Sequence, residues 1–121
     1  MGVLVRVLPR NRFLLLVAEG NVSEAEGVQS FRVDLNAALR STGDDVVLDV
    51  TRLSGVTKRS LAVLVASHAR LAARGRRIVL VDAARGRRES WEGGAAGFSR
   101  RQTIPAAALL LHLDGSQPRE G

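Results

Sequence analysis

The chain has 121 residues and a mass of 13.0 kDa, and 45% of its residues are hydrophobic, which fits one domain with one core. Cysteine is absent, which excludes disulfides, thiolate metal sites and cysteine nucleophiles and agrees with a cytoplasmic protein. The net charge of +6 favours an acidic protein partner, whereas an aromatic content of only 3% disfavours nucleic acid, because base-stacking platforms need aromatic rings.

The first half of the chain predicts a hairpin, a helix and a buried strand. Apolar residues 3–8 and 13–18 flank a short turn, which is the pattern of two antiparallel strands. Ser23, followed three residues later by Glu26, matches a capping box that opens a helix. Residues 45–50 are almost all apolar, as in a strand covered on both faces of a parallel sheet. The predicted helix has a buried stripe of Val28, Phe31, Leu35, Ala38 and Leu39.

The middle of the chain predicts a crossover unit. A loop over residues 51–56 leads to a helix over residues 58–73, and a buried strand over residues 77–81 follows. A strand, a helix and a second parallel strand in this order form a right-handed crossover. The inner side of the helix is predicted to carry Leu61, Leu64, Val65, His68 and Leu71.

The remaining residues predict a weak helix over 87–98, a short edge strand over 102–104 and a final helix over 105–113. The complete order is β-β-α-β-α-β-α-β-α. It describes a single α/β domain with one mixed sheet of about five strands and about four helices, mostly on one face. We expect the domain to cover residues 1–114 and the polar residues 115–121 to form a disordered tail.

No part of the sequence predicts a membrane protein. The apolar runs are far shorter than the ~20 residues that a membrane span needs. The alternating residues 3–8 resemble a strand and lack the three-part pattern of a signal peptide. We therefore expect a cytoplasmic protein.

Groups that catalysis would require do not converge. A catalytic triad needs a nucleophile, a base and an orienting carboxylate. His68 and His112 lie on separate predicted helices without a neighbouring acid, so both are interpreted as packing or partly exposed residues. Asp49, late in a strand, is interpreted as an acceptor for loop amides. Phosphate-binding glycine motifs are missing as well. We expect no enzymatic activity, no cofactor and no metal.

One segment carries a family resemblance. The run VVLDVTRLSGV, followed by TKRSLAVL at the start of a helix, resembles the core of the STAS domain family, the fold of bacterial anti-sigma factor antagonists. The order of elements agrees over residues 3–113, and the specific part of the resemblance covers about 46–82. This resemblance implies a protein that regulates transcription by partner switching, docking onto an anti-sigma factor or a kinase-like protein.

The phosphorylation motif of that family is degenerate in this chain. Where the family has D-S-S-G-L, this chain has Thr57 for the acid and Lys58 for the serine that a kinase modifies, followed by Arg59, Ser60 and the matching Leu61. The resemblance therefore implies that phosphorylation of the usual serine is impossible. The acid of the family's G-x-L-D run is also replaced, since Gly20-Asn21-Val22-Ser23 stands there.

Two hydroxyl residues and two cations remain at the start of this helix. Thr57 and Ser60 are candidate phosphorylation sites, although Thr57 also suits the helix N-cap. Lys58 and Arg59 should cost about 0.3–1 kcal/mol each, because a helix N-terminus carries partial positive charge. In one interpretation, the two cations resemble a permanently dephosphorylated site and select an acidic partner. In the other, both side chains are solvated, and solvent screens their unfavourable interaction with the helix end.

Three hypotheses follow. In the first, a protein partner binds a surface formed by Ser23, Thr57, Lys58, Arg59 and Ser60, with flanking leucines supplying apolar contact. In the second, the chain is a constitutive subunit or scaffold of a larger bacterial assembly, for instance a transporter-associated complex. In the third, a small anionic ligand or nucleotide binds the basic helix start. The oligomeric state stays open, a homodimer included.

Overall fold

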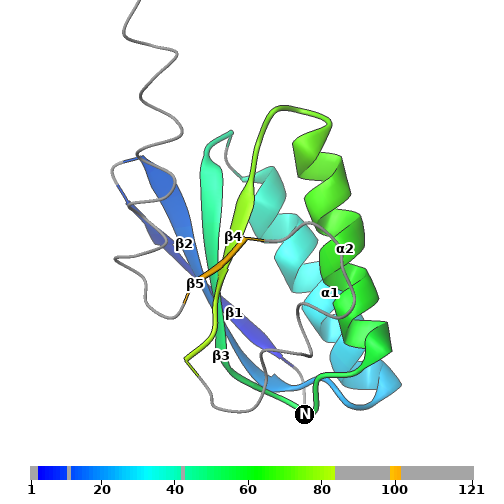
Figure 1. Cartoon of the computed structure of the whole chain (residues 1–121). Helices are drawn as coiled ribbons and strands as arrows, with labels where there is room; N and C mark the ends of the chain where they lie inside the picture. Colours follow the sequence, from blue (N-terminus) through cyan, green and yellow to red (C-terminus); the bar gives the residue numbers. More distant parts are fainter. Residues whose placement is uncertain (1–2, 11, 42, 84–98, 102–121) are drawn as a thin grey trace, which may run out of the picture.

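The computed structural model describes residues 3–10, 12–41, 43–83 and 99–101. In this part of the chain, a mixed sheet of five strands is covered on one face by two helices (Figure 1). The α/β class, the single mixed sheet and the order of elements as far as β4 are as predicted. In chain order the elements are β1 (Leu4–Pro9), β2 (Phe13–Asn21), α1 (Ala25–Arg40), β3 (Asp45–Ser54), α2 (Lys58–Ala72), β4 (Ile78–Val81) and β5 (Ser99–Arg101).

The strands lie in the sheet in the order in which they occur in the chain, β1-β2-β3-β4-β5. β1 pairs antiparallel with β2 across a tight turn, in which the Arg10 N–H donates to the Phe13 carbonyl at 3.0 Å. The other three pairings are parallel. Because the crossovers from β2 through α1 to β3 and from β3 through α2 to β4 step in the same direction along the sheet, the right-handed rule places α1 and α2 on the same face. Figure 1 shows the two helices side by side on that face.

The main core lies between these helices and the sheet. Phe31 and Leu35 of α1, Leu64 of α2, and Leu16 and Leu48 of the strands have no exposed surface. Each fully buried side chain of this size contributes about 1.5–3 kcal/mol. All five residues of the stripe predicted for α1 are buried, and so are Leu61, Leu64 and Leu71 of α2, whereas Val65 and His68 are half-buried.

A second, smaller cluster lies on the other face of the sheet. It consists of Leu15, Val47, Val79 and Val81, all at most 3% exposed. The strand predicted over residues 45–50 is therefore buried on both faces, as expected from its continuous apolar run. None of the helices in the described ranges is long and apolar enough to cross a membrane.

The predicted start of α1 was wrong. Its N-cap is Glu24, which makes no side-chain capping hydrogen bond, and the Ser23–Glu26 capping box does not form. The reason is a competing turn, because the Asn21 side-chain oxygen accepts hydrogen bonds from both the N–H and the hydroxyl of Ser23. Ser23 therefore closes the loop before the helix, and the helix begins at Ala25.

β3 is four residues longer than predicted, ending at Ser54. β2 resumes its pairing after an irregularity between Val17 and Glu19, so that Glu19 lies opposite Arg52 and Asn21 lies opposite Ser54. The sequence predicted a loop at Arg52. In the structure, Arg52 is exposed on β3, opposite Glu19 of β2.

The last strand of the sheet, β5, covers Ser99–Arg101, three residues before the predicted edge strand at 102–104. The predicted helices over 87–98 and 105–113, residue His112, and the predicted tail over 115–121 lie outside the described residues. The two helices described here are thus the first two of the four that were expected.

Candidate functional site

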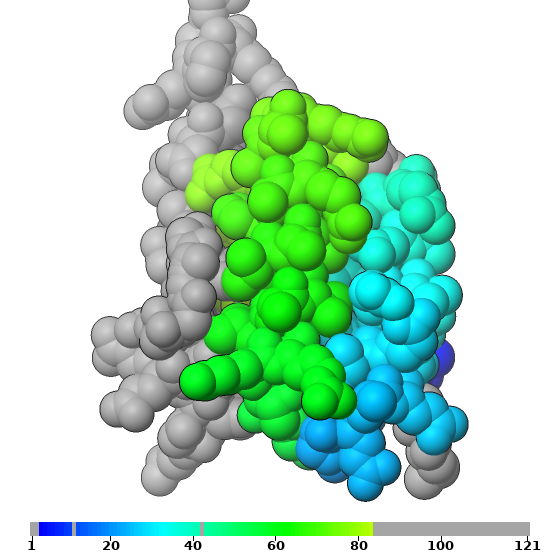
Figure 2. All heavy atoms as spheres, turned by 90° about the vertical axis from the view of Figure 1, so that its right-hand side faces the viewer, coloured from blue at the N-terminus to red at the C-terminus, as the bar shows by residue number. Residues whose placement is uncertain are grey.

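Two loops meet at the carboxyl ends of the parallel strands. The Val22 N–H donates to the Ser54 carbonyl at 2.9 Å, and the Ser54 hydroxyl donates to the Gly20 carbonyl at 3.3 Å. Gly55 packs against Ser23, so closely that an added Cβ would lie 2.7 Å from the Ser23 Cβ. The loops before α1 and α2 are therefore fixed to each other, and the first turns of both helices lie at the same end of the molecule (Figures 1 and 2).

The start of α2 is held by a reciprocal cap. Thr57 is the N-cap, as predicted, and its side-chain oxygen accepts the Ser60 N–H at 3.4 Å. The Ser60 hydroxyl accepts the Thr57 N–H at 2.9 Å and donates to the Thr57 carbonyl at 3.0 Å. Ser60 is only 1% exposed, whereas Thr57 is exposed. The Ser60 hydroxyl is thus buried in the cap and is not accessible to a binding protein.

Lys58 and Arg59 are both exposed on the first turn of α2. That turn contains no acidic residue. Within the described residues, no carboxylate lies within 4.0 Å of either cation. In that part of the chain, no ion pair offsets their unfavourable interaction with the positive helix end.

Arg59 also borders a shallow groove of about 420 Å³ between α1 and α2. Contrary to the expectation, flanking leucines do not line this groove, because Leu61 and Leu64 are buried on the inner side of α2, where the sequence placed them. The groove is lined by Ala25, Val28, Gln29, Arg32, Arg59, Ala62, Val63 and Ala66. Figure 2 faces the outer sides of the two helices that form it.

Several solved structures share the fold of this chain. The chain superposes on the unphosphorylated anti-sigma factor antagonist SpoIIAA with a TM-score of 0.64 and 13% identity, covering 93% of this chain and 99% of that one. The chain has the STAS fold. It also matches a serine-to-glutamate variant of Moorella thermoacetica RsbS, with a TM-score of 0.73, 16% identity and coverage of 92% and 97%. An anti-sigma factor antagonist of Mycobacterium paratuberculosis matches with a TM-score of 0.73, 14% identity and coverage of 91% and 94%.

The STAS fold predicted from residues 46–82 is thereby confirmed. No family model and no curated protein matches the sequence. At 13–16% identity the solved structures establish the fold of the chain and assign no role to its residues.

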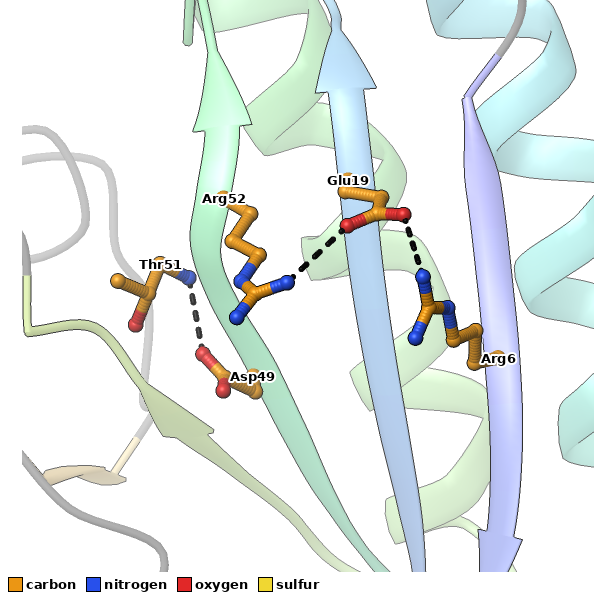
Figure 3. Close-up of polar contacts among 5 residues, drawn as sticks. All are labelled: Arg6, Glu19, Asp49, Thr51 and Arg52. Carbon is orange, nitrogen blue, oxygen red and sulfur yellow. Dashed lines mark hydrogen bonds and ion pairs between the residues drawn. The ribbon is translucent and has the colours of Figure 1, made fainter.

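Two polar groups of this STAS-fold domain have structural roles (Figure 3). Asp49 accepts the Thr51 N–H at 2.9 Å, but both residues lie within β3, so the prediction that Asp49 bonds loop amides at a strand end was wrong in its place. Glu19 lies between Arg6, at 3.1 Å, and Arg52, at 3.6 Å, linking three strands on the face away from the helices. Sequence spacing alone did not reveal this trio. Exposed ion pairs of this kind contribute about 0–1 kcal/mol.

The described ranges contain one histidine, His68, and few clustered acids. No three His, Asp or Glu side chains lie close enough together there to hold a metal ion. His68 is half-buried in α2, and its pKa is lowered by burial and, to a smaller extent, by the charge of Arg77. It lies in the second half of α2, away from the residues at the start of that helix.

Proposed function

We propose that this STAS-fold domain is a cytoplasmic, non-enzymatic regulatory module that docks onto a protein partner through the helix-tip surface. This surface consists of Ser23, Thr57, Lys58 and Arg59, with the groove between α1 and α2 beside it. Ser60 is left out because its hydroxyl is buried in the cap. In such a role the partner is an anti-sigma factor or a kinase-like protein, the class of partner that the STAS resemblance implies.

The observation that carries the proposal is the pair of exposed cations on the first turn of α2. Lys58 and Arg59 stand where the helix dipole disfavours positive charge, and no carboxylate among the described residues neutralises them. An acidic partner surface would supply the missing negative charge. The groove next to Arg59 offers small apolar side chains, which a partner side chain can cover.

The same surface bears on regulation. Thr57 is the exposed hydroxyl of the cap, whereas Ser60 is buried, so Thr57 is the residue at which a kinase would act. A phosphate there would place two negative charges beside Lys58 and Arg59 and would compete with an acidic partner for them. Mass spectrometry of the protein from its native cells would detect a phosphate on Thr57, and a phosphate found on Ser60 would contradict this assignment.

The docking surface is tested by charge reversal. We expect the Lys58→Asp/Arg59→Asp double variant to lose the partners that affinity capture recovers with the parent protein, because two attractive contacts become repulsive. Arg10→Asp/Arg12→Asp is the matched control, since it makes the same change of net charge in the β1–β2 turn at the opposite end of the sheet. Equal recovery of partners by the helix-tip variant and the parent would remove this surface.

The second candidate function is a constitutive subunit of a larger bacterial assembly. It is favoured by Lys58, which the STAS resemblance places at the position of the family's phosphorylated serine, because a permanent charge gives no switch. Quantitative mass spectrometry separates the two functions. A regulatory partner is captured in amounts that change with growth conditions, whereas an assembly is recovered at a constant ratio of subunits.

A further inference from the structure

A second groove lies at the other end of the two helices, remote from the helix-tip surface. Its volume is about 430 Å³, within the ~300–1,000 Å³ of small-molecule sites. Four arginines line it: Arg40 of α1, Arg70 of α2, and Arg74 and Arg76 of the segment that leads to β4. In Figure 2 this region is at the upper end of the two helices.

Arg76 differs from the other three because it is buried, with 9% of its surface exposed. Its Nε donates to the Asp44 carbonyl at 2.9 Å, and its Nη1 donates to the Leu39 carbonyl at 3.3 Å. Its Nη2 is buried and has no hydrogen-bond acceptor in the structure as described. An unpaired buried charged donor is costly, so an acceptor that enters the groove would satisfy it.

The four guanidinium groups have no carboxylate within 4.0 Å in the described ranges of the chain. Arg70 instead donates to the side-chain oxygen of Asn36 at 2.7 Å, and Ser67 donates to the same oxygen at 3.2 Å. The Asn36 side-chain oxygen therefore accepts two hydrogen bonds already. The amide nitrogen of Asn36 adds a further hydrogen-bond donor to the groove.

The helix ends account for only part of this positive charge. α1 ends at Arg40 and α2 ends at Ala72, and each helix C-terminus is equivalent to roughly −0.5 of a charge. Two such ends offset about one of the four arginines. Two of the carbonyls there already have partners, since the Leu39 carbonyl accepts Arg76 and the Leu71 carbonyl accepts the Arg74 and Arg76 N–H groups.

We propose that this groove binds the phosphate group of a small phosphorylated molecule. Guanidinium groups bind phosphate oxygens through paired charge-assisted hydrogen bonds, and four arginines line this cavity. Leu39, Leu71 and Ala73 add apolar lining for the organic part of such a molecule. The ligand would contact the last turns of α1 and α2, whereas a partner at the helix-tip surface contacts their first turns.

The test uses the full chain, with inorganic pyrophosphate and adenosine monophosphate as probes. Isothermal titration calorimetry gives the affinities, and ¹H–¹⁵N spectra give the location. We expect saturable binding that shifts the amide signals of Asn36, Ser67, Leu71 and Arg76. Arg76→Ala is avoided, because Arg76 also holds two carbonyls of the fold. Arg70→Ala and Arg74→Ala remove exposed side chains instead, and each should weaken pyrophosphate binding about tenfold or more.

Two controls separate a site from general attraction to a basic protein. Arg32→Ala, which removes an exposed arginine elsewhere on α1, should change the affinity less than about twofold. Lys58→Asp/Arg59→Asp should leave pyrophosphate binding intact, so failure of this site is distinguishable from failure of the helix-tip surface. The proposal is overturned by the absence of saturable binding, by equal losses in Arg32→Ala and Arg74→Ala, or by an oligonucleotide that binds the same residues more tightly than either probe.

Discussion

Gly55 and Ser23 pack against each other across the two loops that precede the helices. A Cβ on residue 55 would lie 2.7 Å from the Ser23 Cβ, and the backbone φ of Gly55 is +67°. Residue 55 therefore needs glycine for two separate reasons, the left-handed backbone and the lack of space. This contact holds the loop that carries Ser23 beside the loop that leads to Thr57.

We expect Gly55→Ala to destabilise the protein more than Gly75→Ala. Gly75 has nearly the same backbone, with a φ of +73°, but a Cβ there would meet nothing within 4 Å. Gly75→Ala should therefore cost only the backbone strain, about 1–2 kcal/mol. Gly55→Ala should cost about 1–3 kcal/mol beyond that, because it adds overpacking. Urea unfolding measures both, and equal losses would show that the Ser23 contact does not constrain residue 55.

Gly27→Ala should also destabilise the protein, although alanine has a higher helix propensity than glycine. In an open helix this change would stabilise by about 0.5–1 kcal/mol. Here a Cβ would lie 2.1 Å from the Asn21 carbonyl oxygen, which is backbone and cannot rotate away. We expect a net loss of about 1–3 kcal/mol in urea unfolding. Gly43→Ala, where a Cβ meets nothing within 4 Å, should stay within about 0.5 kcal/mol of the parent. A stabilised Gly27→Ala protein would contradict the close approach of α1 to the end of β2.

His68 should make the protein less stable in acid. Burial, and then the charge of Arg77, lowers its pKa in the folded state below the usual 6.5. The unfolded chain therefore binds a proton more readily, and stability falls as the pH drops below 6.5 towards the folded-state pKa. Thermal unfolding of the parent and of His68→Gln over this pH range measures the contribution. The stability of the variant should depend less on pH than that of the parent. Identical pH profiles of the two proteins would contradict a contribution of His68.

The periodic segments of the sequence were sufficient to predict the order of the elements from β1 to β4, whereas the STAS fold was predicted from the family resemblance of residues 46–82. The stripe of α1, the continuous apolar run of β3 and the cap at Thr57 depend on neighbouring residues alone, and the structure contains all three. The start of α1 could not be predicted, because the Ser23 side chain had two possible hydrogen-bonding roles. Ser23 could cap the helix or close a turn with Asn21, and the path of the loop decided for the turn.

The site was less accessible to sequence reasoning than the fold. Lys58 and Arg59 were singled out from the family motif and from their place at the start of a predicted helix, but Ser60 was not recognised as buried, since its hydroxyl completes the Thr57 cap. The phosphate groove was missed altogether. Arg40 and Arg76 are far apart in the chain, and only the parallel run of α1 and α2 brings them to one cavity.

The charge at Lys58 should have opposite effects on stability and on binding. Lys58→Glu replaces an unfavourable cation on the first turn of α2 with a favourable acid, so we expect it to stabilise the protein by about 0.6–2 kcal/mol, twice the usual dipole effect. Lys58→Gln, which only removes the charge, should give about half of this gain. Both gains should shrink at high salt, because the position is exposed.

Partner binding should follow the reverse order, with Lys58 tightest, Lys58→Gln weaker and Lys58→Glu weakest, because an acidic partner gains nothing from the variants. Thermal unfolding and partner affinity, measured on the same three proteins, decide the matter. Opposite rankings mean that the lysine lowers the stability of the free domain and serves recognition. Variants that gain stability while binding the partner as tightly as the parent would mean that Lys58 lies outside the interface, and docking would then have to be sought in the groove between α1 and α2.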